Sequence, residues 1–371
     1  MGDYAQVDDV AVANIAQIND VPYANCSQIN DCTKAASGAT KWCGVHLDRE
    51  KTYASNSDLT SWSVYDSNNS GSPTGSTDPY YIAYGKDALD GNPRWCATLQ
   101  NVTDELVYTD DPTNENAWTV VTTLRNGSSD ITMKLFVIEW GNGYWMAAGD
   151  DGDTLLRSDD GALWDEVDVS GATSINSGKA IYALISDGAG NWWFAQENRI
   201  YKSTNDGASF SLHHTLLDAG GSDPGDIRGF TYTNNTLVAL CKSTGDMFAA
   251  ASSDTTDWSN ETTLTSVGNF GQQTRIASAG GRVVIAYNLK YWAADVSGKS
   301  ITLEHNNASL PGSHGNARCI STDGSTWVVG CSDGDVVTST DGGDNWSISA
   351  TNVATSNLEM RDNAPDVHLP L

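Results

Sequence analysis

A unit of about 45 residues recurs along most of the chain, and this repeat restricts the possible folds more than any other feature. Each copy contains an apolar segment with one position, here called the anchor, that is usually tryptophan. The anchors are Trp42, Trp95, Trp145, Trp193, Leu237, Val283 and Trp327. Successive anchors lie 44 to 53 residues apart, and in six copies a polar turn ending in an aromatic residue follows the anchor by 17 to 23 residues.

Six copies also have an apolar stretch before the anchor, at 80–84, 135–140, 181–185, 227–232, 275–279 and 317–321. A unit therefore predicts four short strands. Sheets of this size cannot bury both faces alone, but they can when they stack around a common axis. We predict an all-β, seven-bladed β-propeller with four-stranded blades and a short N-terminal arm, in which the matched tryptophans pack between blades. The predicted boundaries are 1–33 for the arm, 34–353 for the propeller and 354–371 for a C-terminal tail that closes the ring or reaches a neighbour.

The composition agrees with this architecture and excludes some partners. The 35 glycines, 13 tryptophans and 14 tyrosines are typical of short strands joined by tight turns. A net charge of −27 repels nucleic acids and anionic membranes, so we expect no nucleic-acid partner. The N-terminus lacks the pattern of a signal peptide and no apolar run is long enough to span a bilayer, so we expect no membrane insertion.

Three turns carry a shared motif in which serine, an Asp or Asn, glycine and a closing aromatic residue follow at fixed spacing. This motif resembles the Asp-box, and the chain is similar over about 40–350 to the BNR/Asp-box propellers, a group that includes sialidases, sortilin-like receptors and photosystem assembly factors. The resemblance implies a propeller and says little about activity. In each turn the Asp or Asn would cap backbone N–H groups, and the aromatic ring would pack under the hairpin. The turn residues are Ser158, Asp160, Gly161, Trp164, Ser203, Asn205, Gly207, Phe210, Ser339, Asp341, Gly343 and Trp346.

A second, shorter repeat precedes the propeller. Residues 13–21 recur as 24–32, with apolar side chains at Ile15, Ile18, Val21, Cys26, Ile29 and Cys32. A segment this short cannot form its own core, so it must pack on the propeller, on another copy or on a partner. The pattern resembles the "ANIxKINGV" repeats of N-terminal regions in bacteriophage structural proteins, with Asp in place of the usual Gly. This resemblance implies a docking arm that attaches the propeller to a virion; the alternative is that the segment completes the first blade.

Three arginines hold similar positions relative to their anchors. Arg228, Arg275 and Arg318 precede the anchors by 9, 8 and 9 residues, which places them on the inner strands of consecutive blades. If they face the axis, they can bind a carboxylate, a sulfate or an acidic sugar. The alternative is that they brace the inner-strand turns or neutralise acidic neighbours.

No pattern of catalytic or metal-binding residues stands out. The seven cysteines include no CxxC pair, the histidines lack metal-ligand spacing, and the Asp150, Asp151 and Asp153 cluster lacks the EF-hand order, so a plain turn is favoured over a calcium site. There is no Arg-Ile-Pro strand of the sialidase type and no paired nucleophile and base. We therefore predict a protein that is not an enzyme, with no catalytic residues, no cofactor and no metal.

Together these features predict a virion structural protein of a bacteriophage, a decoration of the capsid, neck or tail or part of a fibre. Its location would be the virion, where several copies dock through the arm to other virion proteins. The propeller would serve adhesion or the binding of host-surface glycans. The alternatives are a sialidase-like glycan-processing enzyme and a cytoplasmic assembly scaffold.

Overall fold

The computed structural model describes residues 42–46, 51–55, 59, 62–66, 78–88, 91–100, 106–112, 117–121, 133–242, 246–251, 255–259, 262–264, 276–312, 315–351, 353 and 358–362. Internal contacts divide the chain into residues 1–40 and 41–371, and every described residue belongs to the second unit. Strands are the only regular elements in this described part. It contains no helix long and apolar enough to cross a membrane.

Six antiparallel sheets are each built from four consecutive strands. The first three are β4 (Asp78–Lys86), β5 (Pro93–Gln100), β6 (Leu106–Thr109) and β7 (Thr119–Val121); β8 (Leu135–Gly141), β9 (Tyr144–Gly149), β10 (Thr154–Ser158) and β11 (Asp165–Asp168); and β12 (Ile181–Ser186), β13 (Trp192–Gln196), β14 (Arg199–Ser203) and β15 (Ser211–Thr215). The next three are β16 (Ile227–Thr233), β17 (Thr236–Cys241), β18 (Asp246–Ala251) and β19 (Thr262–Thr263); β20 (Ile276–Ala279), β21 (Arg282–Tyr287), β22 (Lys290–Ser297) and β23 (Ser300–Ser309); and β24 (Ala317–Thr322), β25 (Trp327–Cys331), β26 (Val336–Ser339) and β27 (Ser347–Ala350).

One further four-stranded sheet is composite. Its strands β1 (Trp42–His46), β2 (Lys51–Ser55) and β3 (Trp62–Asp66) are consecutive, but its innermost strand is β28 (Leu358–Asp362) from the other end of the chain. β28 pairs antiparallel with β1, from Trp42 opposite Asp362 to His46 opposite Leu358. The ring is therefore closed by hydrogen bonds between two segments that are more than 300 residues apart in sequence.

The predicted all-β class and four-stranded blades are confirmed, but the prediction of a seven-bladed propeller needs correction. Only six blades are self-contained. The copy around Trp42 was the one without an apolar stretch before its anchor, so it has no innermost strand of its own. That strand comes from 358–362, within the segment assigned to the tail, whose sequence LEMRD carries too few apolar residues to predict a strand.

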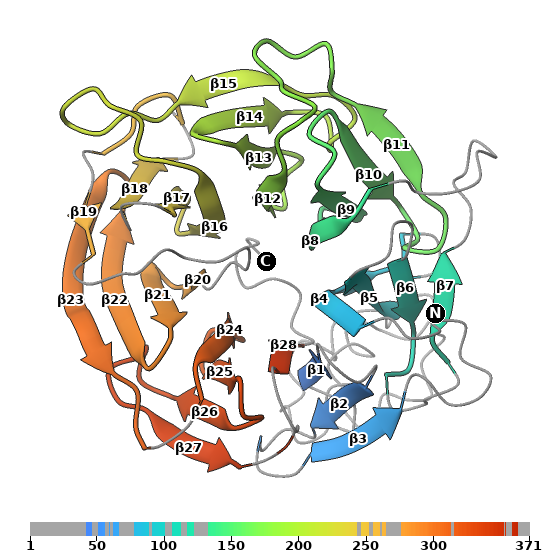
Figure 1. The fold of residues 1–371 in the computed structure, drawn as a ribbon, viewed down its shortest axis with the longest axis vertical. Helices are drawn as coiled ribbons and strands as arrows, with labels where there is room; N and C mark the ends of the chain where they lie inside the picture. The colour runs from blue at the N-terminus through green and yellow to red at the C-terminus, as the bar shows by residue number, and fades with distance from the viewer. Residues whose placement is uncertain are drawn as a thin grey trace, which may run out of the picture. The chain divides into compact units, whose positions relative to one another are not determined.

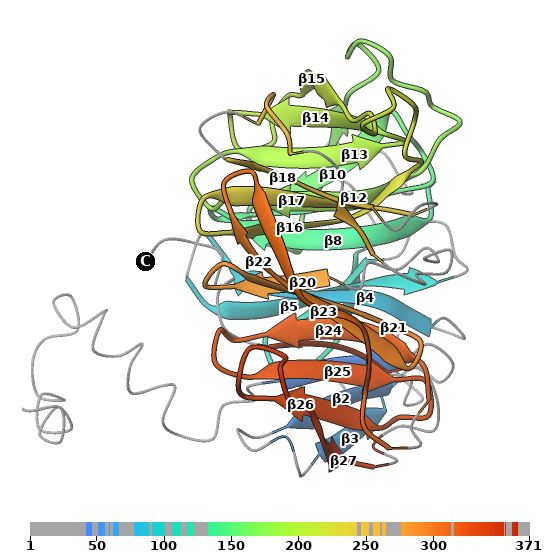
Figure 2. The ribbon, with the colours of Figure 1, turned by 90° about the vertical axis from the view of Figure 1, so that its left-hand side faces the viewer.

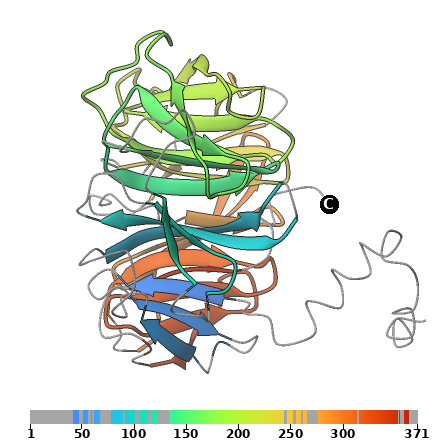
Figure 3. The ribbon, with the colours of Figure 1, turned by 90° about the vertical axis from the view of Figure 1, so that its right-hand side faces the viewer.

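The innermost strands contact their neighbours in the order β4, β8, β12, β16, β20 and β24, and β28 contacts both β24 and β4 (Figure 1). Figure 2 shows β12 to β15 stacked in order from the centre of this ring to its rim, and Figure 3 shows the ring from the opposite side.

The inner strands are apolar on both faces: every residue of β13, β17 and β25 is buried. In the rim strand β23, more exposed and less exposed residues alternate. The core therefore lies between successive sheets.

Tryptophans at matched positions fill these spaces. Trp95, Trp145 and Trp327 are buried in the second strands of their sheets. The strand register refines one anchor, because Trp145 lies opposite Ser158 while Trp192, rather than Trp193, lies opposite Ser203. Trp192 is therefore the structural equivalent of Trp145, and Trp193 takes the next position along the strand.

The three Asp-box-like turns share one set of hydrogen bonds. The serine hydroxyl accepts a bond from the glycine N–H and donates to the Asp or Asn side chain two residues on. The glycine N–H bonds are Gly161 to Ser158 (2.7 Å), Gly207 to Ser203 (3.0 Å) and Gly343 to Ser339 (2.9 Å). The N–H of Asn345 and further bonds hold the pKa of Asp341 down at about 2, so this turn favours the carboxylate at neutral pH and loses that contribution as the pH falls through the folded-state pKa.

Each turn glycine also lies against the second strand of the preceding sheet. All three glycines have positive φ, between 71° and 87°. A Cβ added to any of them would overlap the residue that follows an anchor in that neighbouring sheet. The contacts are Gly161 with Cys96 Sγ (2.8 Å), Gly207 with Met146 Sδ (2.4 Å) and Gly343 with Val284 Cγ2 (2.9 Å). The glycine therefore permits both the turn and the close approach of two sheets.

An arginine from the preceding sheet completes each of these junctions. Its guanidinium donates to the backbone carbonyl of the residue just before the turn glycine. The pairs are Arg94 Nη1 with Asp160 O, Arg157 Nε with Asp206 O (2.7 Å) and Arg282 Nε with Gly342 O (2.9 Å). Three of the sheet junctions thus use the same pair of contacts, a buried glycine and a charge-assisted hydrogen bond.

We expect Gly207→Ala to lower the free energy of unfolding by about 2–4 kcal/mol, since it adds overpacking to the cost of a side chain at positive φ. Gly221→Ala is the matched control, because Gly221 also has positive φ (78°) but nothing lies within 4 Å of an added Cβ. It should cost about 1–2 kcal/mol. Denaturant unfolding of both variants measures the difference. Met146→Ala should reduce the penalty of Gly207→Ala, and equal penalties at the two glycines would contradict the packing argument.

Candidate functional site

The innermost strands of five sheets share an irregularity near their first residue. One extra residue interrupts the pairing with the second strand, at the register shifts Pro79/Tyr81, Leu135/Val137, Ile181/Ala183, Ile227/Gly229 and Ala317/Cys319. Such bulges redirect a side chain out of the regular alternation of a strand. The extra residues are Tyr80, Phe136, Tyr182, Arg228 and Arg318. These five equivalent positions around the centre of the ring, here called the bulge positions, form the candidate site.

Two of the three arginines singled out by sequence lie at bulge positions. Arg228 is in β16 and Arg318 is in β24. Arg275, immediately before β20, lies outside the described residues. The anchor spacing therefore located a real equivalence between Arg228 and Arg318.

Arg228 is packed into the wall formed by neighbouring sheets. Its side chain is only 5 % exposed, and Nη2 lies 2.8 Å from Oδ2 of Asp226. The guanidinium carbon lies 3.5 Å from the centre of the Tyr182 ring, in the geometry of a cation–π contact. These are the contacts of a brace between β12 and β16, one of the two roles the sequence left open.

The stack continues into a third sheet. The Tyr182 ring lies parallel to that of Phe136, with centroids 5.2 Å apart and 5° between the planes. Phe136, Tyr182 and Arg228 therefore form one stack of planar side chains that runs across β8, β12 and β16. Phe136 and Tyr182 are both half-buried, so part of this stack remains accessible.

Arg318 differs from Arg228 in its surroundings. It is half-buried, and its Nε atom is buried without a hydrogen-bond partner among the described residues. An unsatisfied buried donor costs about 1–3 kcal/mol. A water or an anionic group that reaches Nε would remove this cost. Arg318 is also more exposed than Arg228, whose side chain is 5 % exposed, so of the two it is the more accessible to a ligand.

Sequence analysis missed the aromatic members of this site. Phe136 precedes Trp145 by nine residues, the same spacing that relates Arg228 to Leu237 and Arg318 to Trp327. That spacing was a usable signal for Phe136. Tyr182 precedes Trp193 by eleven residues and Trp192 by ten, so the nine-residue spacing does not identify it with either anchor.

The cysteine thiols and the acidic turn at 150–153 have structural surroundings. Burial raises the pKa of the Cys96, Cys241 and Cys331 thiols, which makes them poor nucleophiles. No cluster of three potential metal ligands occurs within the described residues. In the acidic turn, Asp150 accepts the backbone N–H of Lys134 at 2.7 Å, and burial raises the pKa of Asp151. The arm residues Ile15, Ile18, Val21, Cys26, Ile29 and Cys32 lie outside the described part of the chain.

No protein-family model matches the chain, and no curated protein matches its sequence. Solved structures do match. YCF48 bound to a D1 peptide aligns with a TM-score of 0.50 and 13 % identity, over 83 % of this chain and 84 % of that chain. A streptogramin B lyase gives 0.52 and 14 %, over 73 % and 82 %. A chain of the mitotic checkpoint complex gives 0.53 and 12 %, over 79 % and 82 %.

At such low identity these similarities concern the fold alone, and they support the β-propeller. The matched structures include a lyase as well as a peptide complex, so they leave the activity of this chain open. The resemblances to Asp-box propellers and to bacteriophage repeats stay at the level of sequence motifs.

We expect Tyr182→Leu to lower the free energy of unfolding by about 1–2 kcal/mol, because it removes the ring that stacks on both Phe136 and Arg228 while keeping an apolar side chain. Tyr182→Phe keeps the ring and should change stability by less than about 0.5 kcal/mol. Denaturant unfolding compares the two. Equal stability of the Leu and Phe variants would show that the stack contributes nothing beyond apolar burial.

Proposed function

We propose that this chain is a non-catalytic structural protein of a bacteriophage virion, a decoration of the capsid, neck or tail or part of a fibre. It is present in several copies, docks through residues 1–33 to other virion proteins, and displays its propeller for adhesion to host-surface glycans.

The observation that carries the docking part of this proposal is the closure of the ring by β28. The alternative role of the N-terminal repeat was to complete the first blade. The innermost place of that blade is taken by β28, which pairs with β1 along its full length. The ring therefore needs no strand from residues 1–33. The apolar residues of the repeat then serve a contact elsewhere, and the resemblance of residues 13–32 to phage repeats supports a virion partner.

The binding part of the proposal rests on how the described polar groups are used. Arg228 and Asp226 brace the wall of the ring, and the Asp-box-like carboxylates bind turn amides. Reactive groups of this kind in an enzyme would be aimed at a common point in a cleft. A rigid ring whose sheets are joined by repeated contacts suits the display of a surface, since little ordering is lost on binding.

Two other functions stay as alternatives. A sialidase-like enzyme would follow from the Asp-box resemblance, and a cytoplasmic assembly scaffold from the resemblance to photosystem assembly factors. YCF48, a structural neighbour, was solved with a D1 peptide, which favours peptide binding as the scaffold's chemistry.

Deletion of residues 1–33 should leave a folded propeller that no longer joins particles, because residues 41–371 form a compact unit of their own. The measurement is a mass-spectrometric inventory of purified particles, with circular dichroism and thermal unfolding of the truncated protein as the control for folding. A truncated, folded protein that still assembles into particles would overturn the docking role. Turnover of a fluorogenic sialoside by the full-length protein would overturn the non-catalytic role.

A further inference from the structure

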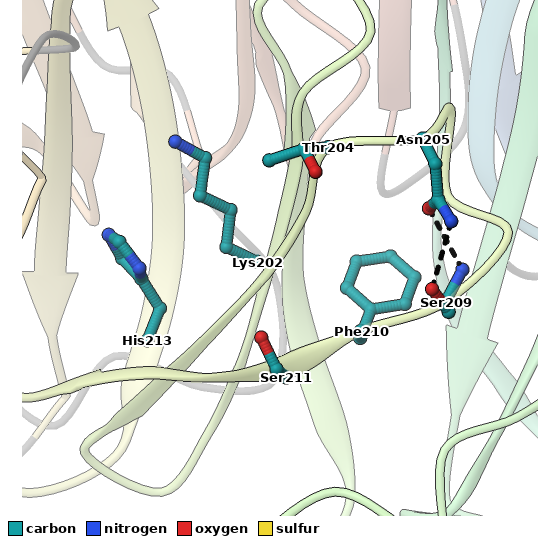
Figure 4. A pocket seen from close by; sticks show the side chains of 7 residues that line it. All are labelled: Lys202, Thr204, Asn205, Ser209, Phe210, Ser211 and His213. Carbon is teal, nitrogen blue, oxygen red and sulfur yellow. Dashed lines mark hydrogen bonds between the residues drawn. The ribbon is translucent and has the colours of Figure 1, made fainter.

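A pocket of 330 Å³ lies on the rim of the sheet β12–β15, beside the turn that joins β14 to β15 (Figure 4). Its lining combines the ammonium of Lys202, the imidazole of His213, the ring of Phe210 and the hydroxyls of Thr204, Ser209 and Ser211. It lies on the rim strands, away from the bulge positions on the innermost strands. The pocket is open to solvent, and Thr204, Ser209 and Ser211 are exposed.

The pocket occurs where two sheets lack the junction of a turn glycine with an arginine of the preceding sheet. Lys202 is the structural equivalent in β14 of Arg157 in β10. Arg157 lies opposite Met146, which follows Trp145, and Lys202 lies opposite Trp193, which follows Trp192. Arg157 donates to the turn carbonyl of the next sheet. The Lys202 ammonium makes no hydrogen bond or ion pair within the described residues, and Nζ lies 5.1 Å from the centre of the Trp193 ring.

The reason lies in the turn of the following sheet. There the closing aromatic Trp258 donates from Nε1 to the carbonyl of Thr255 at 2.7 Å, just as Trp164 donates to Gly161. Thr255 therefore stands at the glycine position of the turn. Its hydroxyl bonds to Nε2 of His213 instead of leaving room for the close junction. Thr255 therefore departs from the glycine pattern in the sheet that follows Lys202.

The charge of the pocket contrasts with the rest of the chain. Among the described residues that line it, Lys202 is a cation and none is a carboxylate, in a protein of net charge −27. The carboxylate of the adjoining turn, Asp206, accepts a hydrogen bond from Asn142 of a different sheet. A local cation without an acidic neighbour in the lining attracts an anionic group and gives it a defined place.

The other side chains suit a hydroxylated ring. Phe210 packs edge-on against Phe194, with centroids 4.9 Å apart, which fixes the orientation of its ring. Asn205 and Ser209 hold each other through two bonds of 2.9 and 3.1 Å, so the turn is preorganised. In Figure 4 the Phe210 ring lies between Ser209 and Ser211, with Lys202 across the pocket. An apolar ring flanked by hydroxyls binds the C–H face and hydroxyl groups of a sugar.

We propose that this pocket binds an anionic sugar residue, with Lys202 paired to its carboxylate or sulfate and Phe210 under its ring. The inference rests on the proposed role in glycan adhesion and names the class of glycan. A carboxylated and a sulfated sugar offer the same chemistry to Lys202, and the experiment separates them.

The test is titration of the full-length protein with methyl glucuronide, galactose 6-sulfate and methyl galactoside, followed by calorimetry or NMR. At least one anionic sugar should bind at least tenfold more tightly than methyl galactoside. Lys202→Met should weaken that binding at least tenfold, while Lys134→Met, which removes the same charge from an exposed position before β8, should leave it unchanged. Equal thermal unfolding midpoints of both variants control for folding.

Two outcomes would overturn the proposal. One is equal binding of anionic and neutral sugars or no binding at all, and the other is inorganic sulfate binding as tightly as the sulfated sugar. Neither outcome bears on the proposed docking role of residues 1–33, which the deletion of those residues tests separately. Loss of sugar binding in Lys202→Met together with unchanged adhesion of particles to host cells would retain the pocket and overturn its part in adhesion.

Discussion

The contact on which this ring depends is the approach of a turn glycine to the second strand of the preceding sheet. Four short strands bury too little apolar area to be stable alone, so each sheet is stabilised by its neighbours. Gly161, Gly207 and Gly343 allow that approach because a Cβ would collide with the adjacent side chain. The arginine bond to the preceding carbonyl then satisfies a turn acceptor that the junction would otherwise bury.

Closure of the ring imposes a second constraint. A chain of self-contained sheets would leave its first and last members held only by side-chain packing. Pairing β28 with β1 joins the two ends by backbone hydrogen bonds, so opening the ring requires loss of a strand pair as well as of packing. Residues 358–362 thus supply the innermost strand of the composite sheet, and closure of the ring needs no strand from residues 1–33.

Local signals in the sequence predicted the local structure well. The spacing of anchors and closing aromatics predicted the four-stranded sheets, and the serine, Asp or Asn and glycine pattern located turns whose hydrogen bonds agree with it. The features that sequence missed are non-local. The pairing of β28 with β1 leaves no periodic trace, and the sequence left the tail open between closing the ring and reaching a neighbour. The bulge position at Phe136 keeps the nine-residue spacing to its anchor, but Tyr182 does not, because it lies ten residues before Trp192. At adjacent tryptophans, Trp192 and Trp193, only the pairing with Ser203 decides which is equivalent to Trp145.

Candidate binding groups are found where the repeat is broken. Where the repeat is kept, its arginines are used in the junctions: Arg157 and Arg282 donate hydrogen bonds to turn carbonyls of the next sheet. In the sheet that follows Lys202, Thr255 stands at the position of the turn glycine, and the Lys202 ammonium lines a pocket together with several hydroxyl groups. Arg318 occupies the position at which Arg228 is held by Asp226 and Tyr182, and its own Nε has no hydrogen-bond partner within the described residues. In a repeat protein of strong negative charge, basic side chains that are not used in such junctions are the groups that can select an anionic ligand.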